Sequence, residues 1–477
     1  MGPIKVSRAS PKNWSTEELV AATGGQAFGI SKVVGVGIDS RKVENGELFV
    51  ALQGPRFDGH EYVEQALEAG ASLAMVSRVP EGWSSNARFL LVDETMVALR
   101  SLAKVARQNT KAYLIGVTGS VGKTGTKEML RTCFSTQGSV HASAESHNND
   151  IGVPLTLANL GSEVDYAVVE MGMNHSGEIR EHSSLARPDM ALITSIAETH
   201  IGNFASLSEI AEAKAEIFSG LQAPGVVVLN RESPFYAKLR KASRQWASTC
   251  LTFGEAADAT VRLVGYQRKG HQYRITASVA GKNICYRLGT PGLHWVYNSL
   301  GAIACVYGAG GDVQKAALNL RNFQLMAGRG KSYSLRLGSK NFTLIDESYN
   351  ASPASLSAAL EVLKESNPSG SGRRVAVLGD MLELGSHEQA LHVALSEDVV
   401  GAGVSMLFTI GSRMLYLSKA LPSSINSYHF DNAGAAIEPL AEGINEGDVI
   451  LIKGSFSIRM GSIVSALQDR SGEVAAP

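Results

Sequence analysis

Residues 116–124 read Gly-Val-Thr-Gly-Ser-Val-Gly-Lys-Thr, a glycine-rich turn between an apolar run at 113–117 and a helical pattern at 127–130. Glycines let backbone N–H groups approach phosphates closely, and the start of a helix adds positive potential. Lys123 would reach the β- and γ-phosphates, and the Thr124 hydroxyl would ligate Mg²⁺. We therefore predict a loop that binds the phosphates of ATP, made of Gly119, Ser120, Val121, Gly122, Lys123 and Thr124.

Two further side chains follow strand-like runs and are candidate metal ligands. Glu170 ends the apolar run 166–169, and His200 follows the run 190–196. In a parallel sheet the carboxyl ends of the strands face the nucleotide crevice. A solvated loop carboxylate is the plainer interpretation of Glu170, and a structural histidine that of His200. We interpret both as Mg²⁺ ligands, because phosphoryl transfer needs metal ligands as well as a phosphate cradle.

Lys214 is expected on the apolar side of a helix. Residues 206–209 read Ser-Leu-Ser-Glu, a capping-box pattern that predicts the start of this helix. Ile210, Ile217 and Leu221 share a face with Lys214 at helical spacing. The long lysine stem could extend to water, but an unpaired ammonium among apolar side chains is costly. We favour a lysine that points inward, toward the metal or the phosphates.

The composition is that of an ordinary globular protein, with 44% hydrophobic and 19% charged residues. The 44 Lys and Arg residues nearly balance the 45 Asp and Glu residues, so the net charge does not indicate nucleic acid or an anionic membrane as a partner. No apolar stretch reaches the ~20 residues that span a bilayer, and the N-terminus lacks a secretory signal. The four cysteines are far apart, as buried thiols in a reducing compartment would be. We expect a cytoplasmic protein without membrane insertion.

The order of elements predicts an α/β protein of three domains, since 477 residues are too many for one core. Residues 1–110 predict a small mixed α/β domain. Residues 111–327 alternate strands and helices, which predicts a central P-loop domain with a mostly parallel sheet, interrupted by antiparallel strands at 259–289. Residues 328–477 predict a Rossmann-like C-terminal domain. Strands are expected at 113–117, 166–169, 190–196, 226–229, 342–345, 374–378, 406–410 and 449–452.

Together these residues resemble the Mur ligases of peptidoglycan assembly, and the resemblance extends over essentially the whole chain. The family pattern T-G-[ST]-x-G-K-T is similar to residues 118–124, and its metal-binding Glu and His look like Glu170 and His200. The family's carbamylated lysine corresponds to Lys214, whose ammonium would become a carbamate anion that helps to hold Mg²⁺. The resemblance implies ATP, two Mg²⁺ ions, and catalytic roles for Lys123, His200 and carbamylated Lys214.

The resemblance also implies nucleotide contacts outside the phosphate loop. Asn298 resembles the family's adenine-binding asparagine. Asp346 or Glu347 could hold the ribose, and Arg329 could contact an ATP phosphate from the third domain. Residues 326–330 are expected to be the hinge on which the domains close.

Three stretches resemble the branch of the family that adds D-alanyl-D-alanine to UDP-N-acetylmuramoyl-tripeptide. Residues 346–353 resemble its D-[DE]-[ST]-Y-N-A-N-P signature, with Ser352 in place of the second asparagine. Residues 147–154 resemble its N-N-x-x-G-x-P substrate loop, and residues 39–51 resemble a UDP-binding first domain. Substrate contacts are therefore expected from Ser40, Arg41, Asn148, Asn149, Tyr349 and Asn350.

The resemblance implies an amide ligase that works through an acyl phosphate and releases UDP-N-acetylmuramoyl-pentapeptide, ADP and phosphate. Its partners are these small molecules, and we expect a monomer. Phe456 departs from the family, whose K-G-S-R-S has arginine at this position. Whether the third residue of the tripeptide is diaminopimelate or lysine stays open.

Three alternatives have weaker support. The sister ligase that adds diaminopimelate or lysine carries a D-N-P-R signature, whereas here Asp431-Asn432 is followed by Ala433. A folylpolyglutamate-synthetase-like ligase would share the phosphate loop and the lysine, but not the stretch 39–51. A nucleotide-switch protein would need a guanine-reading N-K-x-D motif, which the nearest candidate, residues 230–233, does not match.

Overall fold

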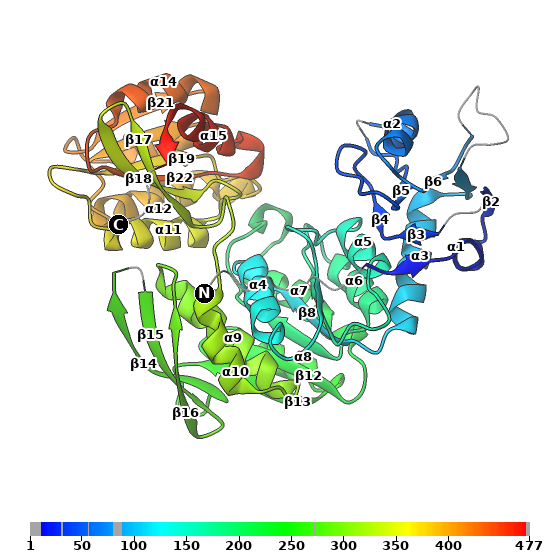
Figure 1. The fold of residues 1–477 in the computed structure, drawn as a ribbon. Coiled ribbons are helices and arrows are strands. Elements are labelled where there is room, and N and C mark those ends of the chain that lie inside the picture. Colours follow the sequence, from blue (N-terminus) through cyan, green and yellow to red (C-terminus); the bar gives the residue numbers. More distant parts are fainter. Residues whose placement is uncertain (1–10, 30–31, 56, 80–87, 271, 474–477) are drawn as a thin grey trace.

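The computed structural model describes residues 11–29, 32–55, 57–79, 88–270 and 272–473. They form three α/β bodies in chain order, which Figure 1 shows in blue, in cyan to green, and in yellow to red. The three-domain α/β fold class predicted from the sequence is confirmed. Within these residues, no helix is both long enough and apolar enough to cross a membrane.

The N-terminal body holds a five-stranded sheet in the order β2-β7-β6-β5-β4. Its strands are β2 Gln26–Phe28, β4 Val36–Gly37, β5 Leu48–Val50, β6 Leu73–Val76 and β7 Phe89–Leu91, and its helices are α1 Thr16–Thr23, α2 Val63–Glu68 and α3 Thr95–Asn109. A short antiparallel pair joins β1 (Asn13–Trp14) to β3 (Val33–Val34). The fully buried Trp14 donates from Nε1 to the carbonyl of Ala158, 3.2 Å away, which anchors this body on the central one.

The central body holds a nine-stranded sheet in the order β16-β15-β14-β13-β12-β11-β8-β10-β9. The strands are β8 Tyr113–Thr118, β9 Val140–Ala142, β10 Tyr166–Glu170, β11 Met190–Ile193, β12 Gly225–Asn230, β13 Ala247–Gly254, β14 Val261–Lys269, β15 Gln272–Val279 and β16 Lys282–Leu288. Strands β8 to β14 pair in parallel, and β14, β15 and β16 form the predicted antiparallel ribbon. The strand expected at 190–196 is β11, which ends at Ile193. Beyond it, the carbonyl of Ser195 accepts from the N–H of Ser120 in the phosphate loop.

Helices cover both faces of the central sheet, as its continuous apolar strands require. They are α4 Lys123–Phe134, α5 Gly152–Ala158, α6 Glu178–Ala186, α7 Leu207–Ala215, α8 Tyr236–Ser243, α9 Leu293–Gly308 and α10 Val313–Asn319. Successive residues of a strand point to opposite faces, so Leu114 and Ile115 of β8 enter two different cores. Leu114 packs in the core of α5, α6 and α7, and Ile115 packs in that of α4, α9 and α10.

The C-terminal body holds a seven-stranded sheet in the order β21-β20-β19-β22-β18-β17-β23. Its strands are β17 Lys331–Leu337, β18 Lys340–Glu347, β19 Arg374–Gly379, β20 Met406–Ile410, β21 Asn426–Phe430, β22 Val449–Lys453 and β23 Gly472–Glu473. Its helices are α11 Pro353–Glu365, α12 Glu388–Gly401, α13 Met414–Ala420, α14 Ala433–Gly443 and α15 Gly461–Arg470. The four predicted strands are present, and β17, β21 and β23 were not predicted.

Helices α11 and α12 lie on the side of the C-terminal sheet that faces the central body (Figure 1). The hydrogen bonds that join the bodies there include the following two. Arg268 at the end of β14 donates to the carbonyl of Glu365 at 2.6 Å. The Gly202 N–H, in the short 3₁₀ helix η2 (Ile201–Asn203), donates to the carbonyl of Glu383 at 2.9 Å. The start of α11 lies near the phosphate loop.

Candidate active site

A cavity of about 550 Å³ lies between the central and C-terminal bodies, within the size range of small-molecule sites. The phosphate loop, the ends of β10 and β11, α9 and the start of α11 form its walls. Most residues predicted to bind ATP, Mg²⁺ or substrate line it: Ser120, Val121, Gly122, Lys123, Thr124, Asn148, Asn149, Glu170, His200, Lys214, Asn298, Arg329, Glu347, Tyr349 and Asn350. Gly119, Ser40, Arg41 and Asp346 are not among its lining residues.

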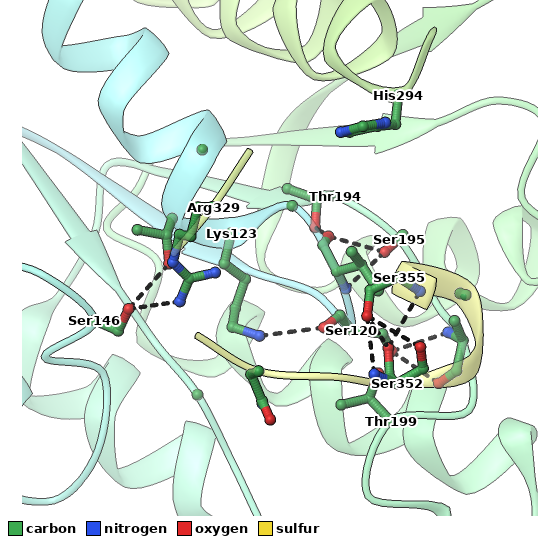
Figure 2. Close-up of a pocket in the computed structure, with 18 of the residues that line it drawn as sticks. Ser120, Lys123, Ser146, Thr194, Ser195, Thr199, His294, Arg329, Ser352 and Ser355 are labelled. Carbon is green, nitrogen blue, oxygen red and sulfur yellow. Dashed lines mark hydrogen bonds between the residues drawn. The ribbon is translucent and has the colours of Figure 1, made fainter. Parts of the chain in front are cut away.

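The phosphate loop joins the end of β8 to the start of α4. Gly119 and Gly122 take positive φ angles of 149° and 88°, which bend the loop in a way that side chains resist. No side chain of the described residues caps the first turn of α4, so the N–H groups of that turn can bind an anion. Lys123 folds back over the loop and donates from Nζ to the carbonyl of Gly119 at 2.7 Å (Figure 2). The loop is therefore shaped to hold phosphate against an ammonium.

Gly119→Ala should destabilise the protein by about 1–3 kcal/mol and weaken nucleotide binding. An added Cβ would lie 1.9 Å from the Thr194 hydroxyl oxygen. That hydroxyl is held in place because it donates to the carbonyl of Val121 at 2.6 Å. Urea unfolding and ATP titration would measure both effects. Gly265→Ala is the matched control, because its Cβ would meet nothing within 4 Å. Wild-type stability in Gly119→Ala would contradict the role assigned to this glycine.

Glu170 is fully buried at the end of β10 and faces the phosphate loop. Its Oε1 accepts hydrogen bonds from Asn148 Nδ2 at 2.7 Å and from the Thr124 hydroxyl at 3.2 Å. Its Oε2 has no hydrogen-bond partner among the described residues. A buried carboxylate oxygen without a partner is costly, and a divalent cation would satisfy it. The residues present therefore suit Mg²⁺ beside Thr124.

His200 lies at the opposite side of the cleft with a positive φ of 61°. Its Nδ1 contacts the carboxylate of Glu383, a residue of the C-terminal body that the sequence had not indicated. The hydrogen bond from His200 lowers the pKa of Glu383. A carboxylate on one ring nitrogen orients a histidine so that the other nitrogen can bind a metal. Glu383 is thus a candidate positioning residue for His200.

Lys214 points inward, as predicted, and only 2% of it is exposed. Burial and, secondarily, the charge of Lys123 lower its pKa well below the usual value. No hydrogen bond or ion pair joins its Nζ atom to another described residue, although the Lys214 carbonyl accepts from the N–H of Glu216. The capping box expected at the start of α7 forms only in part. Ser206 accepts from the N–H of Glu209 at 3.3 Å, but the Glu209 carboxylate reaches the N–H of Ala205 instead of that of Ser206.

Arg329 and Asn298 approach the phosphate loop from two sides. Arg329 donates to the Ser146 hydroxyl at 2.7 Å, next to Lys123 (Figure 2). Asn298 on α9 packs so close that a Cβ at Gly122 would lie 2.8 Å from its Oδ1. Glycine at 122 is therefore required by packing as well as by its φ angle. Both side chains line the cavity, and the phosphate contact of Arg329 and the adenine contact of Asn298 stay predictions.

The two acidic residues at the end of β18 have different surroundings. The buried Asp346 accepts from the N–H groups of Gly328 and Ser348, at 2.7 and 3.1 Å, and from the Ser348 hydroxyl. Its carboxylate therefore fixes the interdomain segment rather than facing the cavity. Glu347 lines the cavity and accepts from Lys453 Nζ at 3.3 Å. Of the two candidates for the ribose, the geometry favours Glu347 over Asp346.

The residues predicted to bind the UDP-linked substrate are divided between two places. Ser40 is buried and donates to Gln65 Oε1 at 2.9 Å, within the N-terminal body. Arg41 is mostly exposed and pairs with Asp39 at 2.8 Å. Asn148 contacts Glu170, and Asn149 accepts from the N–H of Gly152 at the start of α5. The Arg41 side chain is therefore open to solvent, whereas Asn148 lies at Glu170, the carboxylate predicted to bind metal.

Several residues that line the cavity were not predicted from the sequence, among them Ser146, Thr194, His294 and Lys453. Burial and then the charge of Lys453 lower the pKa of His294 to about 4, which keeps this imidazole neutral at neutral pH. Burial lowers the pKa of Lys453 while Glu347 opposes the shift. Of these four residues, only Lys453 lies in a stretch that was compared with a family motif, because it is the lysine of Lys-Gly-Ser-Phe-Ser at residues 453–457.

The fold and the site define a three-domain α/β protein of the P-loop class, with its loop facing a C-terminal body across a cleft. The sequence matches the Mur ligase family catalytic domain over 32–112, the Mur ligase middle domain over 117–306 and the Mur ligase glutamate ligase domain over 334–456. The chain belongs to the Mur ligase family.

Individual relatives match over nearly their whole length. The UDP-N-acetylmuramoyl-tripeptide–D-alanyl-D-alanine ligase of Rickettsia prowazekii is 33% identical over 456 residues, which cover 95% of this chain and 100% of that protein. The Escherichia coli protein of the same name is 36% identical over 441 residues, covering 90% and 93%. A crystal structure of MurF from Acinetobacter baumannii is 28% identical, with a TM-score of 0.82 over 97% of this chain and 100% of that chain.

Proposed function

We propose that this chain is an ATP-dependent amide ligase that joins D-alanyl-D-alanine to UDP-N-acetylmuramoyl-tripeptide. The observation that carries this proposal is that Lys123, Glu170 and Lys214 line one cleft with the substrate-signature residues Tyr349 and Asn350. The relatives that bear this enzyme name support it, since they match at least 90% of the chain.

The reaction activates a carboxylate and then acylates an amine. The terminal carboxylate of the tripeptide attacks the γ-phosphorus of ATP, the bond to the bridging oxygen breaks, and ADP leaves. The D-alanyl-D-alanine amine then attacks the carbonyl carbon of the acyl phosphate. The tetrahedral intermediate expels phosphate, and the amine nitrogen loses its proton. Phosphorylation is needed because a free carboxylate would have to expel oxide.

Lys123 and Arg329 neutralise charge that develops on the transferred phosphoryl group. Burial and the neighbouring Arg329 lower the pKa of Lys123, while Glu170 raises it. Asn298 holds the adenine and Glu347 the ribose, so ATP spans the cleft from α9 to β18. Because two of the substrates, ATP and the UDP-linked tripeptide, are nucleotides, we place the reaction in the cytoplasm, and we expect a monomer.

Thr124 and Glu170 would hold one Mg²⁺ ion, and His200 with Lys214 would hold a second. When bound, Mg²⁺ supplies positive charge that polarises the phosphoryl oxygens. Among the described residues, no group of three or more His, Cys, Asp and Glu side chains is placed to hold a metal. Mg²⁺ is commonly held by one or two carboxylates together with substrate phosphates and water, and Lys214 can become an acidic ligand beside Glu170.

Carbamylation of Lys214 would supply this ligand. The neutral amine attacks CO₂, a nitrogen–carbon bond forms, and one proton is released, which leaves an anionic carbamate. The reaction needs an unprotonated amine, and the lowered pKa of Lys214 provides it. The carbamate would also place a negative charge near the Lys123 ammonium, whose positive charge disfavours a protonated Lys214.

D-alanyl-D-alanine should be the preferred amine, and free D-alanine or diaminopimelate should react poorly. A site for a dipeptide must satisfy an extra amide and a carboxylate displaced by one residue. A single amino acid leaves those groups unpaired, at a cost of roughly 1–3 kcal/mol each. ADP release with each amine in turn, with UDP-N-acetylmuramoyl-tripeptide present, would measure the preference.

The matched control for this assay replaces the tripeptide nucleotide with the dipeptide nucleotide, which the sister ligase would use. Equal rates with D-alanine and D-alanyl-D-alanine would overturn the proposed amine. A preference for diaminopimelate with the dipeptide nucleotide would assign the chain to the sister reaction instead.

A further inference from the structure

Three side chains of the interdomain region stack on one another. The guanidinium of Arg329 lies over the ring of Tyr349, 4.1 Å from its centroid. The Tyr349 ring in turn neighbours that of Phe456, with centroids 5.6 Å apart and planes at 51°. We name Arg329, Tyr349 and Phe456 the arginine stack. Phe456 is its outer member, in the 3₁₀ helix η6 (Phe456–Ile458) that follows β22.

The inner end of the arginine stack lies at the phosphate end of the cleft. Arg329 donates to Ser146 of the central body and lies near enough to Lys123 to lower the pKa of that lysine. An arginine side chain has many rotamers, and fixing its plane before a ligand binds reduces the entropy lost on binding. Stacking on an aromatic face is one way to fix that plane.

The outer end of the stack is not explained by core packing. Phe456 is 70% exposed, the most exposed of the large hydrophobic side chains in the described parts of the chain. It therefore gains little from burial. Its backbone N–H reaches the Asn350 amide oxygen at 3.4 Å, so η6 touches both Tyr349 and the residue after it. Those contacts connect an exposed ring to the nucleotide site.

We propose that Phe456 is a positioning residue for the ligase reaction. Through Tyr349 it holds the guanidinium of Arg329 at the ATP phosphates, and so it sets the affinity for ATP. The arginine that the family carries at this position is replaced here by an aromatic side chain that acts indirectly. The inference rests on the proposed function, because it takes the phosphates of ATP as the ligand of Arg329.

Phe456→Leu should raise the KM for ATP by roughly two- to tenfold, the range expected for loss of an aromatic contact. The kcat and the KM for both other substrates should stay unchanged, as should the thermal midpoint. Phe456→Tyr should restore the wild-type KM, because it keeps the ring. Tyr266→Leu is the matched control: Tyr266 is 46% exposed, its ring centroid lies 5.6 Å from that of Tyr273, and it is on β14 and not among the residues that line the cavity.

A double-mutant cycle tests whether Phe456 acts through Arg329. Lysine cannot stack as a planar guanidinium does, so Phe456→Leu should have no further effect on the KM for ATP in an Arg329→Lys background. Additive effects, an unchanged KM for ATP in Phe456→Leu, or a rise confined to the D-alanyl-D-alanine KM would overturn the inference. So would a lowered thermal midpoint with an equal rise in every KM.

Calorimetric titration with ATP separates this inference from the proposed function. A wild-type protein that binds no ATP would contradict the proposed function itself. Wild-type binding with an unchanged affinity in Phe456→Leu would contradict only the role of Phe456.

Discussion

Lys123→Ala should lower the ligation rate by about a thousandfold or more while the protein stays folded. The Lys123 side chain is only half-buried and bonds to the carbonyls of Gly119 and Ser120, at 2.7 and 3.4 Å, so no core packing depends on it. We propose that its ammonium meets the γ-phosphate when charge develops there. ADP release would measure the loss, and urea unfolding would show that the fold persists.

Two variants give this prediction its controls. Lys127→Ala removes a lysine from the same helix, but one that is fully buried and donates to the carbonyls of Ser143 and Glu145. It should lower stability more than Lys123→Ala does. Thr124→Ala should raise the Mg²⁺ requirement more than it weakens nucleotide binding. Near-wild-type turnover in Lys123→Ala would refute the assignment of the phosphate loop.

The parts of the fold that the sequence predicted are those set by local patterns. The apolar strands, the glycine loop and the buried Lys214 each depend on residues within one or two turns of one another. The strand β21 escaped prediction because its residues, Asn-Ser-Tyr-His-Phe, lie at the sheet edge and need no apolar run. The strand β17 is also partly exposed, and within the described part of the chain it pairs only with β18 and the short β23.

The parts of the site that escaped prediction depend on contacts between distant residues. Glu383 and His200 meet across the interdomain cleft although 183 residues separate them. Lys453 and Glu347 meet because β22 and β18 are neighbours in the C-terminal sheet, which no local pattern encodes. Asp346 and Glu347 belong to the same sequence motif. The Asp346 carboxylate, however, accepts hydrogen bonds from the N–H groups of Gly328 and Ser348. Spacing within a motif does not reveal which carboxylate faces the cavity.

Lys214→Ala should lower the ligation rate at least about a hundredfold, the upper range for loss of support at a metal site. The change removes the side chain that we propose carries the carbamate. A small carboxylate such as acetate should restore part of the activity, because it can occupy the space left by the side chain. Intact mass measurement of the wild-type protein in bicarbonate should show one added CO₂, and Lys214→Ala should show none.

Lys214→Met separates the chemistry of this side chain from its packing. Methionine fills a similar apolar volume without burying an amine. The variant should therefore be at least as stable as the wild type in urea, yet inactive, a trade-off common at functional sites. Acetate should not restore Lys123→Ala, which lacks a cation rather than an anion. Full activity in Lys214→Met, or rescue of both alanine variants by acetate, would show that no carbamate at Lys214 takes part in the reaction.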